Sequence, residues 1–193
     1  MDNFLSHKKI ILASASPRRQ QFLTDLGLSF TVQLKPVEEI YPDNLVHHQI
    51  TDYLALLKAN AFENELAENE ILITSDTLVW HENKALGKPK NAKDAFDMIQ
   101  SMSGKTHEVI TSVCIKTSLN ATVFYSVSKV TFVDLTVDEI DHYISNYKPF
   151  DKAGAYGIQE WIGLIGISKI EGSYSNIVGL PVEKLYQKLK DYA

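Results

Sequence analysis

The sequence has a single cysteine, no long apolar segment and no excess of positive charge. Cys114 cannot form a disulfide within the chain, which is typical of a protein kept in a reducing compartment. No apolar run approaches the roughly 20 residues that a membrane-spanning helix needs. The net charge of −5 argues against general electrostatic binding to DNA or RNA. We therefore expect no membrane span and no nucleic-acid partner.

The N-terminal segment, residues 1–9, lacks the architecture of a signal peptide, so we expect a cytoplasmic protein. A hydrophobic content of 45% and a charged content of 22% are ordinary for a globular domain. We find no internal repeat, linker or low-complexity tract. A chain of 193 residues is therefore expected to form one domain over residues 1–193.

Residues 12–23 have the pattern of a strand end, a tight turn and the first turns of a helix. Ser16 suits the N-cap, because its hydroxyl can accept a hydrogen bond from an unpaired backbone N–H. Pro17 suits the first helical position, where its missing N–H is harmless. Gly27 suits the position just beyond the helix. The stretch predicts a strand–turn–helix unit.

Two arginines, Arg18 and Arg19, fall in the first turn of this predicted helix, where positive charge opposes the helix macrodipole. An anion bound there would use both the exposed N–H groups and the guanidinium groups. Ser14 and Ser16 lie beside them in the turn. The pattern therefore indicates an anion site, and the alternative is two solvated arginines at a helix end.

A second informative stretch is 71–77, where three apolar residues of a central strand lead into Ser-Asp-Thr. Ligands of α/β proteins bind beyond the carboxyl ends of strands. Asp76, expected at this strand end, could hold a metal or activate water. The alternative is that Asp76 caps a turn. An extension of the strand over residues 78–80 is expected.

A third stretch is the loop predicted at 148–159. Gly154 and Gly157 would let the backbone approach a ligand closely. Lys152 adds a positive charge, and the amide of Gln159 offers a donor and an acceptor to the edge of a base. A glycine-containing loop is by itself a weak signal.

The remaining periodic segments complete an alternation of strands and helices with one long hairpin, which predicts an α/β or α+β fold around a mixed, twisted sheet with flanking helices. We expect helices at 17–26, 48–67, 91–102 and 136–147, with a last helix whose first residue is Pro181. We expect strands at 8–13, 30–34, 71–80, 108–117, 121–135 and 162–170, and a loop at 171–176.

Several of these stretches together resemble the Maf family of nucleotide pyrophosphatases over nearly the whole chain. The resemblance implies the Maf/inosine-triphosphatase-like fold, with two lobes flanking a central cleft, and a homodimer is a family-level expectation. The segments that carry the resemblance are 14–19 (Ser-Ala-Ser-Pro-Arg-Arg), Glu38-Glu39, 75–77, 87–89 (Gly-Lys-Pro), 148–159 and 176–181.

The resemblance implies an enzyme, a nucleoside triphosphate diphosphatase that cleaves between the α and β phosphates and releases pyrophosphate. Asp76 would be the general base. Glu39 would be the catalytic or metal-side carboxylate, and a divalent cation, Mg²⁺ or Mn²⁺, would bind Glu39 and Asp76. Lys58 and Lys88 match the two lysines that the family aims at phosphate.

Base choice rests on fewer residues. Family members that act on dTTP and UTP carry Arg, Thr and Gln at the positions of Arg18, Thr77 and Gln159, and this sequence follows that pattern at all three. The expected substrates are thus dTTP and UTP, and the expected role is removal of non-standard or excess nucleotides. The remaining residues expected to contact substrate are Ser14, Ser16, Arg19 and Lys152.

Other interpretations stay open. Glu38-Glu39 could be a solvated acidic pair, and Lys58 a surface lysine that extends along its helix. His107 is left out of the catalytic set, because lone histidines are more often structural. Trp161 departs from the small residues expected after Gln159. The rival function is a non-catalytic nucleotide-sensing regulator of cell division, against which the complete acid and base set argues.

Overall fold

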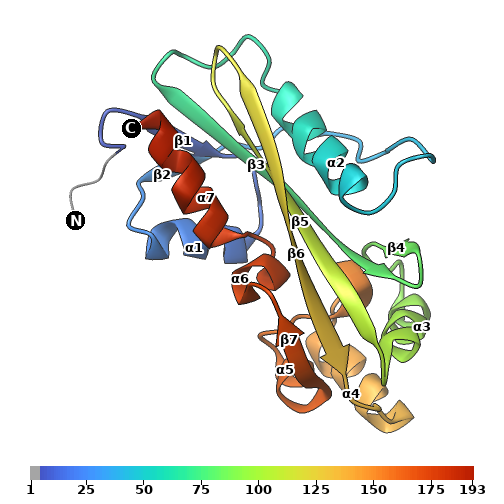
Figure 1. Cartoon of the computed structure of the whole chain (residues 1–193). Helices are drawn as coiled ribbons and strands as arrows, with labels where there is room; N and C mark the ends of the chain where they lie inside the picture. The colour runs from blue at the N-terminus through green and yellow to red at the C-terminus, as the bar shows by residue number, and fades with distance from the viewer. Residues whose placement is uncertain (1–4) are drawn as a thin grey trace. The chain divides into compact units, whose positions relative to one another are not determined.

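The computed structural model describes residues 5–193; residues 1–4, part of the segment inspected for a signal peptide, lie outside it. Within the described range the strands form one mixed seven-stranded sheet in the order β2-β1-β3-β5-β6-β7, with β4 paired to β3 (Figure 1). β1 runs parallel to β2 and β3, while β3/β4 and β6/β7 are antiparallel. The strands are β1 (Lys9–Leu12), β2 (Phe30–Val32), β3 (Glu70–His81), β4 (Lys84–Leu86), β5 (Thr106–Lys116), β6 (Ala121–Phe132) and β7 (Ile167–Glu171).

The helices lie between these strands in the expected alternation. Within residues 5–193, no helix is both long and apolar enough to span a membrane. The helices are α1 (Pro17–Asp25), α2 (His48–Asn60), α3 (Ala92–Met102), α4 (Val137–Tyr147), α5 (Trp161–Gly166), α6 (Tyr174–Val178) and α7 (Val182–Leu189), with 3-10 turns η1 (Ala153–Ala155) and η2 (Lys190–Tyr192).

The described chain divides into two compact units. The first contains the residues up to Asp76 together with 111–126 and 179–193. The second contains residues 77–110 and 127–178. The long strands β3, β5 and β6 each contribute residues to both units, so the sheet is shared while each unit has its own core.

The core of the first unit follows the two-residue alternation of strands, which sends successive side chains to opposite faces. Helices α1 and α7 lie on one face and α2 on the other (Figure 1). The face towards α2 includes Ile11, Leu72 and Cys114, which pack with Ala55 and Ala59. The opposite face includes Ile10, Leu12, Ile71, Ile73, Val113 and Ile115, which pack with Leu23, Leu185 and Leu189.

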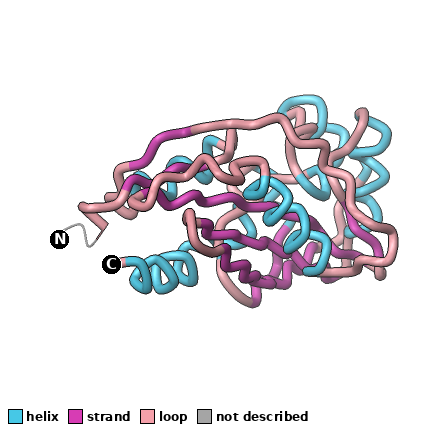
Figure 2. Tube along the Cα trace, turned by 90° about the horizontal axis from the view of Figure 1, so that it is seen from above, coloured by secondary structure: helices cyan, strands magenta, loops and turns pink. Residues whose placement is uncertain are grey.

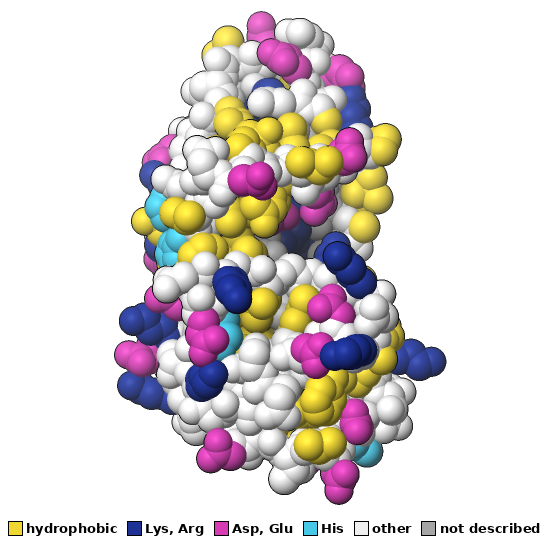
Figure 3. All heavy atoms as spheres, turned by 90° about the vertical axis from the view of Figure 1, so that its right-hand side faces the viewer, with side chains coloured by type: hydrophobic (Ala, Val, Ile, Leu, Met, Phe, Trp, Pro, Cys, Tyr) yellow, Lys and Arg dark blue, Asp and Glu magenta, His cyan; other side chains and the backbone are white. Residues whose placement is uncertain are grey.

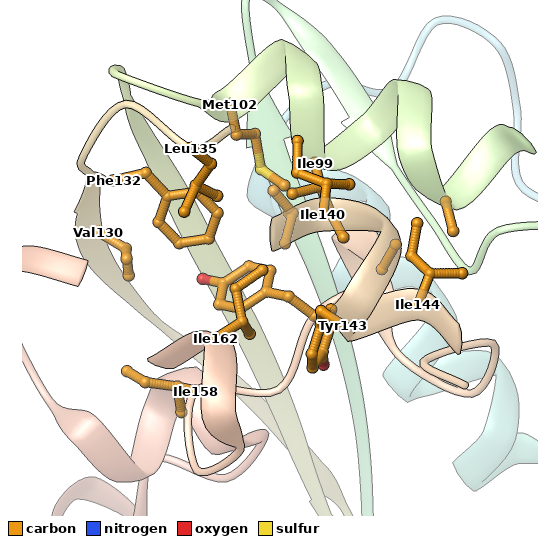
Figure 4. Close-up of a cluster of buried hydrophobic side chains, with 14 of the residues drawn as sticks. Ile99, Met102, Val130, Phe132, Leu135, Ile140, Tyr143, Ile144, Ile158 and Ile162 are labelled. Atoms are coloured by element: carbon orange, nitrogen blue, oxygen red, sulfur yellow. The ribbon is translucent and has the colours of Figure 1, made fainter. Parts of the chain in front are cut away.

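The second unit buries one cluster between its part of the sheet and helices α3, α4 and α5 (Figure 4). The helix starts follow the predicted caps. Asn91 Oδ1 accepts a hydrogen bond from Asp94 N at 2.9 Å, and Thr136 with Glu139 forms a complete capping box. The cluster includes Phe132, Ile140, Tyr143, Ile144, Ile158 and Ile162.

Three expectations about element bounds were wrong. The helix expected over 48–67 ends at Asn60, where the backbone tightens: Phe62 N and Glu63 N donate to the carbonyls three residues back, those of Ala59 and Asn60, at 3.1 and 3.0 Å. The strand expected to reach residue 135 ends at Phe132. Pro181 is the N-cap of α7 and not its first helical residue.

The segment expected as a strand over 162–170 is a short helix followed by a strand. α5 takes its first part and β7 begins at Ile167. A Cβ at Gly163 would lie 1.8 Å from the carbonyl oxygen of Ile158, so this helical turn packs directly on the preceding backbone. A short apolar run such as 162–170 is compatible with a buried helical turn and with a strand. Periodicity alone cannot distinguish the two. The loop expected at 171–176 also contains the start of α6.

Candidate functional site

The turn between β1 and α1 has the predicted geometry. Ser16 is the N-cap of α1, and its Oγ accepts a hydrogen bond from Arg19 N at 3.5 Å. The backbone N–H of Ser16 donates in turn to Ser14 Oγ at 3.3 Å. Gly27 follows the helix with φ 70°, as expected for a residue beyond a helix end. The two serines thus shape the N-terminus of α1.

Arg19 connects this turn to two other segments of the first unit. Its Nε donates to the carbonyl of Gly179 at 2.8 Å, and one terminal nitrogen donates to Ser75 O at 2.9 Å and Ser14 Oγ at 3.3 Å. Burial lowers the pKa of the Arg19 guanidinium, while the nearby charge of Asp76 raises it. The Arg19 fork binds protein acceptors, so Arg19 holds this turn to the segments around residues 75 and 179. Arg18, like Arg19, is half-buried on the first turn of α1.

Asp76 lies inside β3 and not at its end as expected, because β3 continues to His81. Its position is nevertheless special. The parallel pairing of β3 with β1 ends at Leu12 and Ile73, and beyond it the chain of β1 turns towards α1. Asp76 therefore lies past the carboxyl end of β1, where ligands of parallel sheets bind.

Lys58 on α2 joins two carboxylates of the first unit. Its Nζ lies 2.6 Å from Asp76 Oδ1 and 3.0 Å from Glu39 Oε1. The lysine and aspartate side chains are 17% and 11% exposed, whereas that of Glu39 is 48% exposed. Glu39 lies in the long loop 33–47, which has no helix or strand (Figure 2). The structure thus brings together a rigid carboxylate, an ammonium and a carboxylate from a loop.

This cluster fits a divalent cation in its donor chemistry. Among residues 5–193, no group of three or more His, Cys, Asp or Glu side chains is arranged to hold a metal. Mg²⁺, however, is commonly bound by one or two carboxylates together with substrate phosphates and water. Glu39 and Asp76 are two hard oxygen donors that converge on one ammonium group. A cation bound with phosphate oxygens would find suitable ligands there.

The other predicted site residues belong to the second unit. Thr77 follows Asp76 in β3, and Lys88 is exposed in the loop after β4. The Gly154 N–H donates to the Gly87 carbonyl at 3.0 Å, which joins that loop to η1. Gln159 is exposed in the loop before α5. Lys88 and Gln159 are thus accessible to a ligand, whereas Thr77 is half-buried.

Lys152 has a different environment. Its Nζ lies 2.8 Å from Asp151 Oδ1 and 3.0 Å from Glu160 Oε1, and its side chain is 10% exposed. Tyr143 donates a hydrogen bond to the other oxygen of Glu160. Sequence inspection missed Glu160 and Tyr143, as it missed the carbonyls of Ser75 and Gly179, because their roles arise from contacts between distant segments. The one local signal for these contacts is the acidic residue Glu160 directly after Gln159.

The histidine left out of the catalytic set is a core residue. His107 is 2% exposed, and its Nε2 lies 2.8 Å from the Tyr156 hydroxyl. Burial, with a smaller effect of His81, lowers the pKa of His107 to about 3. Cys114 is likewise buried, which raises the pKa of its thiol to about 11, as expected for an inert core thiol.

Trp161 packs against the His142 ring at a centroid distance of 4.8 Å.

Surface charge is mixed on the face that Figure 3 shows. Lys and Arg side chains alternate there with Asp and Glu side chains, without a broad area of one sign. The cations of the candidate site do not belong to a broad positive surface. They are Lys58 within its acidic cluster, Lys88 on its loop and Arg18 on α1. A small anion can be held by a few positive charges of this kind.

The chain is similar to known proteins over nearly its whole length. A family model described as Maf-like protein matches residues 9–192. The dTTP/UTP pyrophosphatase of Flavobacterium johnsoniae is 65% identical over 185 residues, covering 96% of this chain and 95% of the relative. The dTTP/UTP pyrophosphatase of Christiangramia forsetii is 53% identical over 191 residues, covering 99% and 97%.

Among solved structures, the Staphylococcus aureus Ham1 protein has a similar fold, with a TM-score of 0.55 at 15% sequence identity. The match covers 96% of this chain and 100% of that one. It confirms the expected fold class, a mixed sheet with flanking helices. The matched family model and the two relatives lead to one identification: the chain belongs to the Maf family.

Proposed function

We propose that this chain is a nucleoside triphosphate pyrophosphatase that hydrolyses dTTP and UTP to the monophosphate and pyrophosphate. The observation that carries the proposal is the contact of Lys58 with both Asp76 and Glu39, at 2.6 and 3.0 Å. This cluster places a proton acceptor beside a positive charge, and its two carboxylates could hold a divalent cation that would offset the charge of a phosphate chain. The relatives named dTTP/UTP pyrophosphatase, which match nearly end to end, support the substrate class.

Asp76 is assigned as the general base. It lies on a rigid strand and is 11% exposed, and Lys58 holds its Oδ1, so Oδ2 is the atom assigned to accept the proton from water. The water oxygen forms a bond to phosphorus as the P–O bond between the α and β phosphates breaks. The electron pair of that bond leaves with pyrophosphate. No covalent enzyme intermediate is needed, since such transfers depend mainly on positioning and charge.

The positively charged residues are assigned two roles, neutralising the substrate and positioning the loops of the site. Arg18, Lys58 and Lys88 neutralise the triphosphate, whose charge repels an attacking oxygen. Arg19 and Lys152 are assigned mainly to holding the site's loops, because their charged groups already bind acceptors of the protein. Ser14 and Ser16 are assigned to shape the N-terminus of α1, which favours an anion.

A divalent cation, Mg²⁺ or Mn²⁺, is assigned to Glu39 and Asp76. When bound, such an ion polarises phosphate oxygens and neutralises developing charge. Glu39 is the half-exposed member of the pair, carried by the loop 33–47, so it can adjust to an incoming nucleotide. Asp76, in β3, keeps a fixed position.

Base choice is assigned to Thr77 and Gln159, with Arg18. Uracil and thymine present two carbonyl acceptors that flank one N–H donor. An amide can donate to a carbonyl and accept from that N–H, so Gln159 matches the pattern. Its exposed side chain is available for such contacts. We place this activity in the cytoplasmic nucleotide pool.

The test is direct analysis of products. Purified protein is incubated with dTTP in the presence of Mg²⁺, Mn²⁺ or EDTA, and dTMP, pyrophosphate and orthophosphate are quantified. We expect dTMP and pyrophosphate in equal amounts with metal, and none with EDTA. Binding of dTTP without cleavage would favour the non-catalytic nucleotide-sensing regulator. Release of orthophosphate in place of pyrophosphate would contradict the assigned bond.

A further inference from the structure

The loop that carries Gln159 is held by a buried polar network of the second unit. Tyr143 on α4 is fully buried and lies within the hydrophobic cluster of that unit (Figure 4). Its hydroxyl accepts a hydrogen bond from Gly157 N at 2.9 Å and donates one to Glu160 Oε2. One hydroxyl therefore fixes the backbone two residues before Gln159 and the side chain directly after it.

The acid of this network is in turn paired. Glu160 Oε1 lies 3.0 Å from Lys152 Nζ, and the two side chains are 21% and 10% exposed. Each oxygen of the Glu160 carboxylate thus has its own partner. Because a half-buried acid without partners is costly, this arrangement favours a single position for the residue that follows Gln159.

The backbone between these contacts is tightly packed. A Cβ at Gly157 would lie 2.9 Å from Lys152 Cε and 2.9 Å from Glu160 Cδ, so the ion pair lies directly on the glycine. The next carbonyl, that of Ile158, is covered by Gly163 at the start of α5. Gln159 is therefore an exposed side chain on a backbone that is fixed on both sides.

We propose that Tyr143, Glu160 and Lys152 are positioning residues for base recognition, which hold the Gln159 amide in the orientation that distinguishes uracil and thymine from other bases. This inference rests on the proposed function, in which Gln159 contacts the base. An amide must be fixed closely to discriminate, because a loosely held donor and acceptor can adapt to other patterns. The network supplies that restraint without contacting the substrate.

The main test is Tyr143→Phe, which keeps the buried ring and removes the hydroxyl. The readout is the ratio of kcat/KM for dTTP to that for dCTP, whose base has a different donor and acceptor pattern. We expect the ratio to fall about tenfold, with the loss for dTTP mostly in KM, since a misplaced contact group weakens recognition. Turnover at saturating dTTP should change much less, because Asp76 and Lys58 are held by other contacts.

A merely structural role for Tyr143 would not produce this result. The control is Ile140→Val, on the same helix and in the same cluster, which should lower the melting temperature without changing the ratio. Glu160→Gln is the second variant. It keeps the size of the side chain but removes the charge that binds Lys152, and it should lower the ratio in the same direction. Glu160→Gln also tests the inference if Tyr143→Phe fails to fold.

A double-mutant comparison with Gln159→Leu decides the mechanism. If Tyr143 acts through Gln159, the double variant should discriminate no less than Gln159→Leu alone. Additive losses, an unchanged ratio in Tyr143→Phe and Glu160→Gln, or an unchanged ratio in Gln159→Leu would each overturn the inference. A wild-type enzyme that shows no preference for dTTP would instead overturn the proposed function, and that result is read before any variant is measured.

Discussion

The ammonium of Lys58 lies 2.6 Å from Asp76 Oδ1, across 18 positions of sequence. The lysine comes from α2 and the aspartate from β3, and both side chains are largely buried. Charge-assisted hydrogen bonds of this length are strong and directional. The contact therefore fixes the carboxylate that we assign as the base, and it places a positive charge beside it.

The first prediction concerns Asp76. Asp76→Asn keeps the shape of the side chain and an oxygen for Lys58, but it removes the proton acceptor. We expect turnover of dTTP to fall on the order of 10²–10⁴-fold, the usual contribution of acid–base catalysis. Circular dichroism should show an unchanged fold. Near-normal turnover by the purified variant would exclude the assigned role.

The second prediction concerns Arg18 and Lys88. Lys88 is exposed, so Lys88→Ala should change thermal stability little, as is usual for surface charges, while Arg18→Ala removes the half-buried cation on α1. Catalytic efficiency with dTTP should fall strongly, through KM above all. Lys90→Ala, an exposed lysine two positions beyond Lys88, is the matched control. Efficiency equal to wild type in the Arg18 variant would leave the anion-site interpretation without support.

The third prediction concerns the contribution of Arg19 to stability. Lysine at position 19 keeps the charge but cannot reproduce the fork that binds the carbonyls of Ser75 and Gly179. We expect Arg19→Lys to lower the free energy of unfolding by about 1–3 kcal/mol, the range for lost hydrogen bonds to a charged group. Lys90→Arg, a cation exchange at an exposed position, is the control and should have a much smaller effect. Urea denaturation of both variants decides, and equal stabilities would contradict a bracing role for Arg19.

The fourth prediction concerns acid stability. The pKa of His107 is lowered from 6.5 to about 3 in the folded protein, first by burial. Between these values the unfolded chain binds the extra proton, so stability falls as pH decreases through this window, by at most about 1.4 kcal/mol per pH unit. Replacing His107 by Leu should reduce the slope of stability against pH from 6.5 to 4. The same substitution at the exposed His7 is the control. An identical slope in wild type and His107→Leu would contradict this account.

Local sequence signals predicted the elements that local chemistry determines. Ser16, Asn91 and the Thr136 capping box start helices where expected, because an N-cap needs just one side chain and a nearby backbone N–H. The strand that carries Asp76 was also recognised from its apolar residues. The error over 162–170 has the opposite cause: the turn at Gly163 depends on a backbone contact with Ile158, which no periodicity reveals.

The site was predicted as a set of residues but not as an arrangement. The family resemblance supplied Glu39, Lys58 and Asp76, and the structure then brought them to one point. The resemblance could not show that Arg19 binds the carbonyls of residues 75 and 179, or that Lys152 is paired with Glu160. Two lysines or two arginines look alike in sequence, and the acceptors around each one decide whether it is held by the protein or open to a ligand.

The most direct test of the central claim is a nucleotide panel with the wild-type protein. Pyrophosphate release is measured with Mg²⁺ or Mn²⁺ for dTTP, UTP, ATP, GTP and methylated GTP, and the values of kcat/KM are ranked. A site that forms specific hydrogen bonds to its base discriminates strongly, because the wrong base leaves polar groups unpaired. We predict that dTTP and UTP head the ranking. A purine triphosphate at its head would contradict the pyrimidine assignment, and no pyrophosphate from any nucleotide would contradict the enzyme itself.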